Sequence, residues 1–144
     1  MENVGGRPDA AEARAALSDI QQVQRAVRDT PWPAWLYVVN GVLVGAMALT
    51  FLLEERRLGA LWAVAAVVIV VNIAAGYRMG IPWVLPASRG FLAAVAVSAA
   101  CVVAAALVAD LTERAWPVVV LAAAATAVYL AGGVAHRRST GRPR

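Results

Sequence analysis

Two asparagines are the polar side chains placed most deeply in otherwise apolar stretches of this chain. Asn40 and Asn72 fall at similar depth from the same end if their two stretches run antiparallel. An amide without a partner is costly in hydrocarbon, whereas a hydrogen bond between helices contributes about 0.6–2 kcal/mol there. Two interpretations stay open. The amides join two helices, or they line a polar cavity with Tyr37, Tyr77 and Arg78 close by.

The other reactive side chains do not form a catalytic set. Ser98 and Cys101 lie one helical turn apart, but no acid or base accompanies them at that depth, so nucleophilic catalysis is not indicated. The single histidine, His136, stands beside Arg137 and Arg138, where a contact with lipid headgroups is expected. One cysteine and one histidine exclude a Cys/His metal cluster. We therefore predict no catalytic residue, no metal and no cofactor.

The composition points to a membrane. Of 144 residues, 61% are hydrophobic and 15% are charged, compared with about 45–50% and about 25% in soluble domains. The basic residues are all arginine, 13 in number, and the net charge is +4. They are scattered between apolar blocks and form no stripe, so nucleic acid is not an expected partner. We therefore expect the lipid bilayer to surround the apolar part of the chain.

Four apolar stretches between residues 30 and 136 have the length of membrane spans. They are residues 34–53, 58–77, 90–109 and 115–135, and none has a charged residue in its interior. About 20 helical residues cross roughly 30 Å of hydrocarbon. The predicted fold is an all-α polytopic membrane protein, a four-transmembrane-helix bundle preceded by a cytoplasmic helix.

The arginines predict the orientation of that bundle. Four crossings put the N-terminus, the 78–89 connection and the C-terminus on one side, together with ten arginines. Arg56, Arg57 and Arg114 fall on the other side. By the positive-inside rule both termini are cytoplasmic in a multi-pass inner-membrane protein. Residues 1–8 are expected to be a disordered tail, and residues 137–144 a basic one.

Residues 9–29 are predicted to form a separate amphipathic helix. Asp9 and Glu12 resemble a capping box at its start, and the prolines after Thr30 end it. Its apolar residues recur at helical spacing and form one stripe: Ala13, Ala16, Leu17, Ile20, Val23 and Val27. An isolated helix of this length is marginal in water, so the stripe needs a surface. The membrane, the bundle's own loops, a second copy and another protein all remain possible, and we favour a protein contact.

A short motif predicts close helix packing in the first span. Gly41 and Gly45 form a GxxxG pattern, which lets two backbones approach each other. The partner is either a neighbouring helix of the same chain or the same helix in a second copy.

Two segments give the chain a resemblance to a known family. The run from Ala11 to Ile20 followed by Thr30-Pro-Trp-Pro-Ala-Trp35, and the connection from Arg78 to Gly90, resemble small four-span membrane proteins of high-GC bacteria. That resemblance implies a four-helix bundle, and its members are often encoded beside winged-helix transcription regulators. It implies no activity, but it favours a role in binding a partner.

The classes of function can now be compared. A proton-coupled exporter needs a titratable carboxylate within the membrane, and the spans contain none. No phosphate-binding, dinucleotide-binding or zinc motif occurs. The sequence thus favours a non-enzymatic adaptor, sensor or accessory subunit that acts through residues 9–29. The alternatives are a small transporter, a protein that binds a lipid or another hydrophobic ligand, and, less favoured, an intramembrane enzyme acting on a lipid-like substrate.

Overall fold

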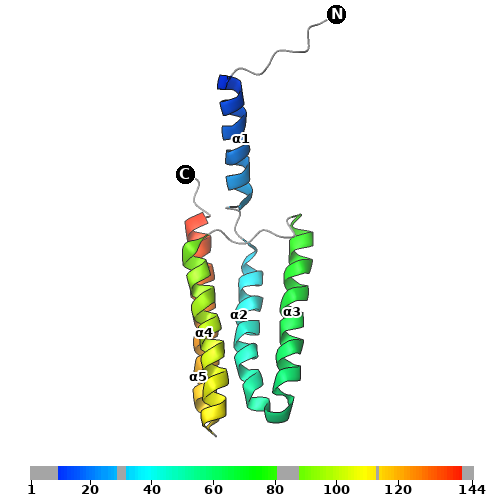
Figure 1. Cartoon of the computed structure of the whole chain (residues 1–144), viewed down its shortest axis with the longest axis vertical. Helices are drawn as coiled ribbons and strands as arrows, with labels where there is room; N and C mark the ends of the chain where they lie inside the picture. Colours follow the sequence, from blue (N-terminus) through cyan, green and yellow to red (C-terminus); the bar gives the residue numbers. More distant parts are fainter. Residues whose placement is uncertain (1–9, 29–31, 81–87, 113, 141–144) are drawn as a thin grey trace, which may run out of the picture.

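The computed structural model is all-α, as predicted, and describes residues 10–28, 32–80, 88–112 and 114–140 (Figure 1). Its elements are α1 (Ala10–Arg28), α2 (Ala34–Leu49), the 3₁₀ helix η1 (Thr50–Arg56), α3 (Arg57–Arg78), α4 (Arg89–Leu111) and α5 (Ala115–Thr140). The expected tail of residues 1–8, the cap at Asp9, most of the 78–89 connection and the last four residues lie outside the described residues.

Three segments of the described chain are long and apolar enough to cross a membrane. They are Ala34–Arg78, Arg89–Leu111 and Ala115–Ser139. The first has 45 residues and is not straight, because it contains α2, η1 and α3, and α3 returns alongside α2 (Figure 1). These segments indicate a small multi-pass membrane protein.

The helix type changes inside the predicted first span, residues 34–53, just before the chain reverses from α2 to α3. The α-helix ends at Leu49, and residues 50–53 continue it as a tighter 3₁₀ helix. The Thr50 hydroxyl donates a 2.7 Å hydrogen bond to the Met47 carbonyl three residues earlier, which suits that tighter winding. Glu54 then adopts a positive φ of 44°, a left-handed conformation that breaks the helical path.

The core lies between α2, α4 and α5. Helices α4 and α5 pack against each other, and α2 lies against both. One buried cluster consists of Ala48, Ala105, Val118 and Ala122. Three of these four residues are alanines, so the backbones approach closely where lipid supplies no hydrophobic force between helices.

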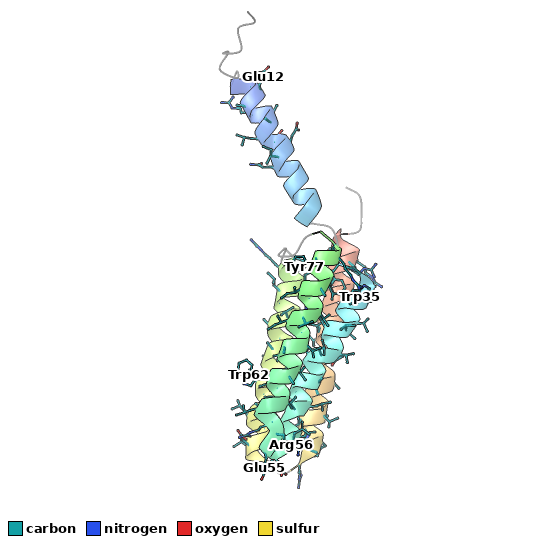
Figure 2. All side chains as sticks on the ribbon, turned by 90° about the vertical axis from the view of Figure 1, so that its right-hand side faces the viewer. Glu12, Trp35, Glu55, Arg56, Trp62 and Tyr77 are labelled. Carbon is teal, nitrogen blue, oxygen red and sulfur yellow. The ribbon has the colours of Figure 1, made fainter. Side chains whose placement is uncertain are left out.

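Helix α3 has a peripheral position, which differs from an evenly packed four-helix bundle. In the part of the chain that the structure describes, its backbone packs against α2 and η1 and not against α4 or α5, while the Arg57 side chain at its start forms an ion pair with Asp110 of α4. Its buried residues are Ala75 and Gly76, both small. Trp62 projects from its outer face and is 73% exposed (Figure 2). The arrangement is therefore three packed helices with a fourth that packs mainly on one of them.

Helix α1 stands apart from the other helices. It packs against no other described element and extends beyond one end of the bundle (Figure 1). The side chains from Ala11 to Gln21 are exposed, including Leu17 at 58% and Ile20 at 54%. The N-terminal part of the predicted stripe is thus uncovered within this chain, whereas the Val23 and Val27 side chains lie outside the described part.

Candidate functional site

The two predicted asparagines lie against each other between α2 and α3. The Asn40 Nδ2 donates to the Asn72 Oδ1 at 3.1 Å, and the Asn72 Nδ2 donates back to the Asn40 Oδ1 at 2.8 Å. The Asn72 Nδ2 also donates to the Val68 carbonyl one turn earlier, at 2.8 Å. Asn40 is only 4% exposed. This reciprocal pair satisfies polar groups that would otherwise be costly in an apolar region, and it joins the two helices.

The other three residues of the predicted polar set do not join this pair. Tyr37 is buried in a group of aromatic side chains from α2, α4 and α5. Tyr77 and Arg78 are exposed at the end of α3, and Figure 2 shows Tyr77 at the end of the bundle nearest α1. The structure therefore brings Asn40 and Asn72 together and places the remaining three elsewhere.

An aromatic cluster lies between α2, α4 and α5 at the end of the bundle nearest α1 (Figure 1). The Tyr37 ring lies edge-on to Phe91 with centroids 5.6 Å apart, and Phe91 lies edge-on to Tyr129 at 5.5 Å. Phe91 is in the first turn of α4, where its backbone N–H donates to the Ser88 side chain at 3.4 Å. Edge-to-face pairs of this kind add stability beyond the area that they bury.

The position of His136 corrects the expected contact with lipid headgroups. Its imidazole is 3% exposed and stacks on Phe91 with ring centroids 5.5 Å apart. It also lies 6.3 Å from the Tyr37 ring. The flanking arginines suggested a headgroup position, but His136 lies on the inward face of α5, where it completes the aromatic cluster.

The GxxxG glycines of α2 face α5 of the same chain. A Cβ built on Gly41 would lie 2.9 Å from a methyl carbon of Leu130. A Cβ on Gly45 would overlap the Thr126 hydroxyl and lie 3.2 Å from the Ala122 carbonyl oxygen. Of the two predicted partners, the neighbouring helix of the same chain occupies this face.

Two adjacent glycines of α5, which no sequence motif indicated, also lie in close helix contacts. A Cβ on Gly132 would overlap the Ala94 side chain, and one on Gly133 would lie 2.6 Å from the Tyr37 ring. Their spacing from Tyr129 and His136 is that of one helix face, a periodicity that identifies them. These glycines let α4 and the aromatic cluster approach α5.

The Ser98 hydroxyl lies within hydrogen-bond distance of two backbone carbonyls, one on its own helix and one on α5. Its hydroxyl lies 2.8 Å from the Ala94 carbonyl one turn earlier and 3.0 Å from the Ala125 carbonyl on α5. The second contact connects α4 to α5 in the middle of both helices. The role of Ser98 is thus consistent with helix packing.

The hydrogen-bonded polar groups at these positions connect one helix to another. Neither the amide pair nor the Ser98 contact includes a carboxylate or imidazole that could act as a base. Within the described ranges, no group of three or more His, Cys, Asp and Glu residues could hold a metal ion.

No family model, no curated protein and no solved structure matches this chain. The resemblance to small four-span bacterial proteins therefore stays an expectation. The structure itself supports a small helical protein with three candidate membrane-spanning segments.

Proposed function

We propose that this chain is a non-enzymatic integral membrane protein that acts as an adaptor or accessory subunit by presenting α1 to a protein partner. In this proposal the hairpin of α2 and α3 crosses the bilayer twice, and α4 and α5 cross once each. Both termini and α1 are then in the cytoplasm. The observation that carries the proposal is the exposed N-terminal part of the apolar stripe of α1, from Ala13 to Ile20, which no other described element covers.

The helix lengths are compatible with four crossings. Helix α2 has 16 residues, which span about 24 Å at the usual rise. The four 3₁₀ residues that follow add roughly 8 Å. The other three helices have 22, 23 and 26 residues, each long enough for about 30 Å of hydrocarbon. Ten of the 13 arginines then lie on the side of the termini, which supports their cytoplasmic placement.

The exposed stripe supports a protein partner rather than a purely structural role for α1. Most of the stability of a helix in a protein comes from packing of its apolar face, and the 19-residue helix α1 has no such packing within this chain. Burial of the Leu17 and Ile20 side chains would be favourable, by about 25 cal/mol for each Å² of apolar surface removed from water. Acidic and basic residues nearly balance along α1, which gives little attraction to an anionic membrane surface. A protein surface is the occupant that fits these features best.

Photo-crosslinking in intact cells tests the proposal. A photoreactive amino acid replaces Ile20 in the stripe or, as the matched control, Ser18 on the opposite face of the helix. We expect discrete protein adducts from position 20 and few from position 18. An adduct of twice the 15.1 kDa chain mass identifies a second copy as the partner, and any other protein mass identifies a different one.

A charge in the stripe provides the second part of the test. With the photoreactive group at position 20, Leu17→Asp should lower adduct yield by about tenfold or more, because burying an unpaired carboxylate is costly. Ser18→Asp adds the same charge on the opposite face and should leave the yield unchanged. Equal protein labelling from both positions, or labelling of lipid alone from position 20, would overturn the proposal.

A further inference from the structure

A cavity of about 760 Å³ lies at the end of the bundle far from α1, where η1 meets the turn between α4 and α5. Its volume falls within the range of small-molecule sites. Apolar and small side chains form much of its lining: Phe51, Leu52, Ala109, Leu111, Ala115 and Val118. Polar and charged residues complete it: Glu54, Asp110, Thr112 and Arg114.

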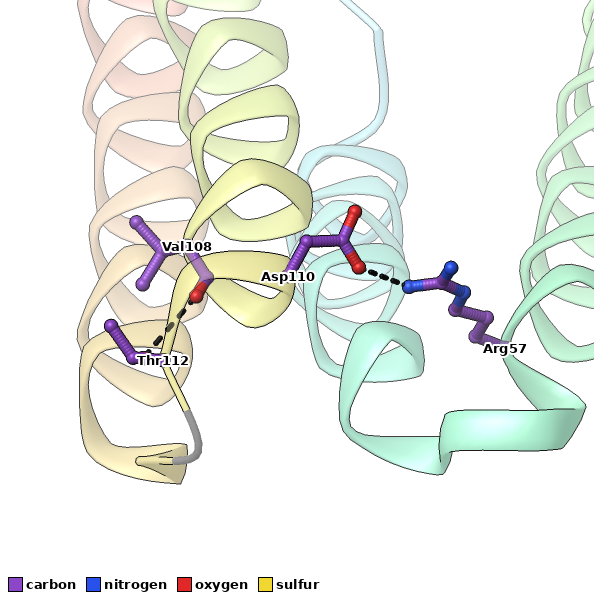
Figure 3. A network of polar contacts seen from close by, with 4 residues as sticks. All are labelled: Arg57, Val108, Asp110 and Thr112. Atoms are coloured by element: carbon purple, nitrogen blue, oxygen red, sulfur yellow. Dashed lines mark hydrogen bonds and ion pairs between the residues drawn. The ribbon is translucent and has the colours of Figure 1, made fainter.

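One of these charged groups is already neutralised. The Asp110 carboxylate at the end of α4 accepts a hydrogen bond from the Arg57 guanidinium at the start of α3, and the two form an ion pair (Figure 3). Thr112 is turned back to its own helix, where its hydroxyl donates to the Val108 carbonyl at 3.2 Å (Figure 3). The charge of Asp110 and the hydroxyl of Thr112 are thus both engaged within the protein.

Among the described residues that line the cavity, Glu54 and Arg114 are the two remaining charged groups. Arg57 and Asp110 form the single salt bridge found among the described residues. Neither Glu54 nor Arg114 therefore has an ion-pair partner among those residues. Glu54 occupies its place because the chain reverses at its positive φ. Arg114 comes from the turn just before α5. The cavity thus presents one carboxylate and one guanidinium beside apolar side chains such as Phe51, Leu111 and Val118.

Such a combination matches a headgroup that carries a phosphate and a primary amine. A guanidinium binds phosphate oxygens through paired N–H groups, and a carboxylate accepts hydrogen bonds from an ammonium. If the helices span the membrane as proposed above, this end of the bundle lies at the headgroup level, with the apolar lining toward the acyl chains. We infer that the cavity binds the headgroup of an amine-containing phospholipid, of which phosphatidylethanolamine is the simplest. This inference rests on the proposed membrane insertion but not on the adaptor role.

Lipid retention by the purified full chain tests this inference. The protein in detergent micelles is mixed with phosphatidylethanolamine, phosphatidylcholine or phosphatidylglycerol, and bound lipid is counted by native mass spectrometry. We expect phosphatidylethanolamine to be retained about three- to fivefold better than the other two, since exposed ionic contacts contribute modestly. Soluble glycerophosphoethanolamine, which has the headgroup without the tails, should compete only at much higher concentration.

Charge-matched variants locate the binding. Glu54→Gln should remove the preference for the primary amine, and Arg114→Gln should lower retention of all three lipids. The controls Glu55→Gln and Arg56→Gln remove one negative and one positive charge from η1, outside the cavity lining, and should have no effect.

Three results would overturn the inference: equal retention of the three lipids, equal losses in the control variants, or full competition by the soluble headgroup at the lipid's own concentration. None of these results bears on crosslinking from Ile20. The lipid site and the adaptor role can therefore fail separately.

Discussion

The amide pair between α2 and α3 gives an asymmetric prediction. Replacing either asparagine with valine, an apolar residue of similar size, removes both interhelical hydrogen bonds. The two losses are not equivalent, because Asn72 keeps its bond to the Val68 carbonyl when Asn40 is replaced. Asn40 is almost completely buried, and its described hydrogen bonds both go to Asn72. Asn72→Val should therefore destabilise the protein more than Asn40→Val.

The size of the effect follows from the two bonds. Hydrogen bonds between membrane helices contribute on average about 0.6 kcal/mol and at most about 1.7 kcal/mol. A reciprocal pair should thus give a coupling free energy of about 1–2 kcal/mol in a double-mutant cycle. The buried Asn40 amide that Asn72→Val leaves without its partner adds a further cost of about 1–3 kcal/mol. In the double variant both amides are gone, and that further cost disappears.

Equilibrium unfolding in mixed detergent micelles, followed by helix content, measures these differences. The set is the parent chain, the two single variants, the double variant and Val70→Leu. Val70 lies on the exposed face of α3 and controls for an apolar substitution away from the pair. We expect Val70→Leu to be nearly neutral and the double variant to be more stable than Asn72→Val.

Additive losses would refute this reasoning. If the double variant loses the sum of the two single losses, the amides contribute independently, and their reciprocal contact does not join the helices. Equal losses in the two single variants would contradict the asymmetry that Val68 introduces.

Three further substitutions test the packing in the same unfolding assay. Gly45→Ala pushes a methyl group into α5 and should cost about 1–3 kcal/mol, whereas Gly59→Ala meets no atom within 4 Å and should be neutral or gain about 0.5 kcal/mol. Ser98→Ala removes the hydroxyl contact between α4 and α5 and should cost about 1 kcal/mol. Arg57→Gln should cost less than about 1 kcal/mol, because its ion pair with Asp110 is partly exposed, and that cost should shrink as salt is added.

Some contacts could be predicted because single residues stand out from an apolar background. Asn40 and Asn72 are rare amides at matched depth, and burial without partners is costly enough to indicate a pairing. Gly41 and Gly45 indicate a close helix contact because only small residues allow two helix backbones to approach closely. The sequence did not determine which groups these residues contact. In the structure the two amides contact each other, and the two glycines lie against α5.

The arrangement of the helices could not be predicted in the same way. Alanine and valine cover all sides of the spans, so no polar face shows which side meets another helix. The peripheral position of α3 and the cavity beside Glu54 both depend on how η1 reverses the chain. The expected lipid contact of His136 was wrong because it rested on the two arginines that follow it in sequence. Its helical spacing from Tyr129 places it on the buried face of α5 instead.

The peripheral position of α3 explains why a single amide pair should matter so much. Helices α4 and α5 share buried side chains and close backbone contacts along their lengths, so no single hydrogen bond decides their association. Helix α3 packs on α2 and η1 through few buried residues, and lipid offers no hydrophobic gain for bringing it there. Its attachment therefore depends on the amide pair in its C-terminal part and the Arg57 ion pair at its N-terminal end. The ion pair is partly exposed and weak, so the amide pair must supply most of the directional contribution that keeps α3 beside α2.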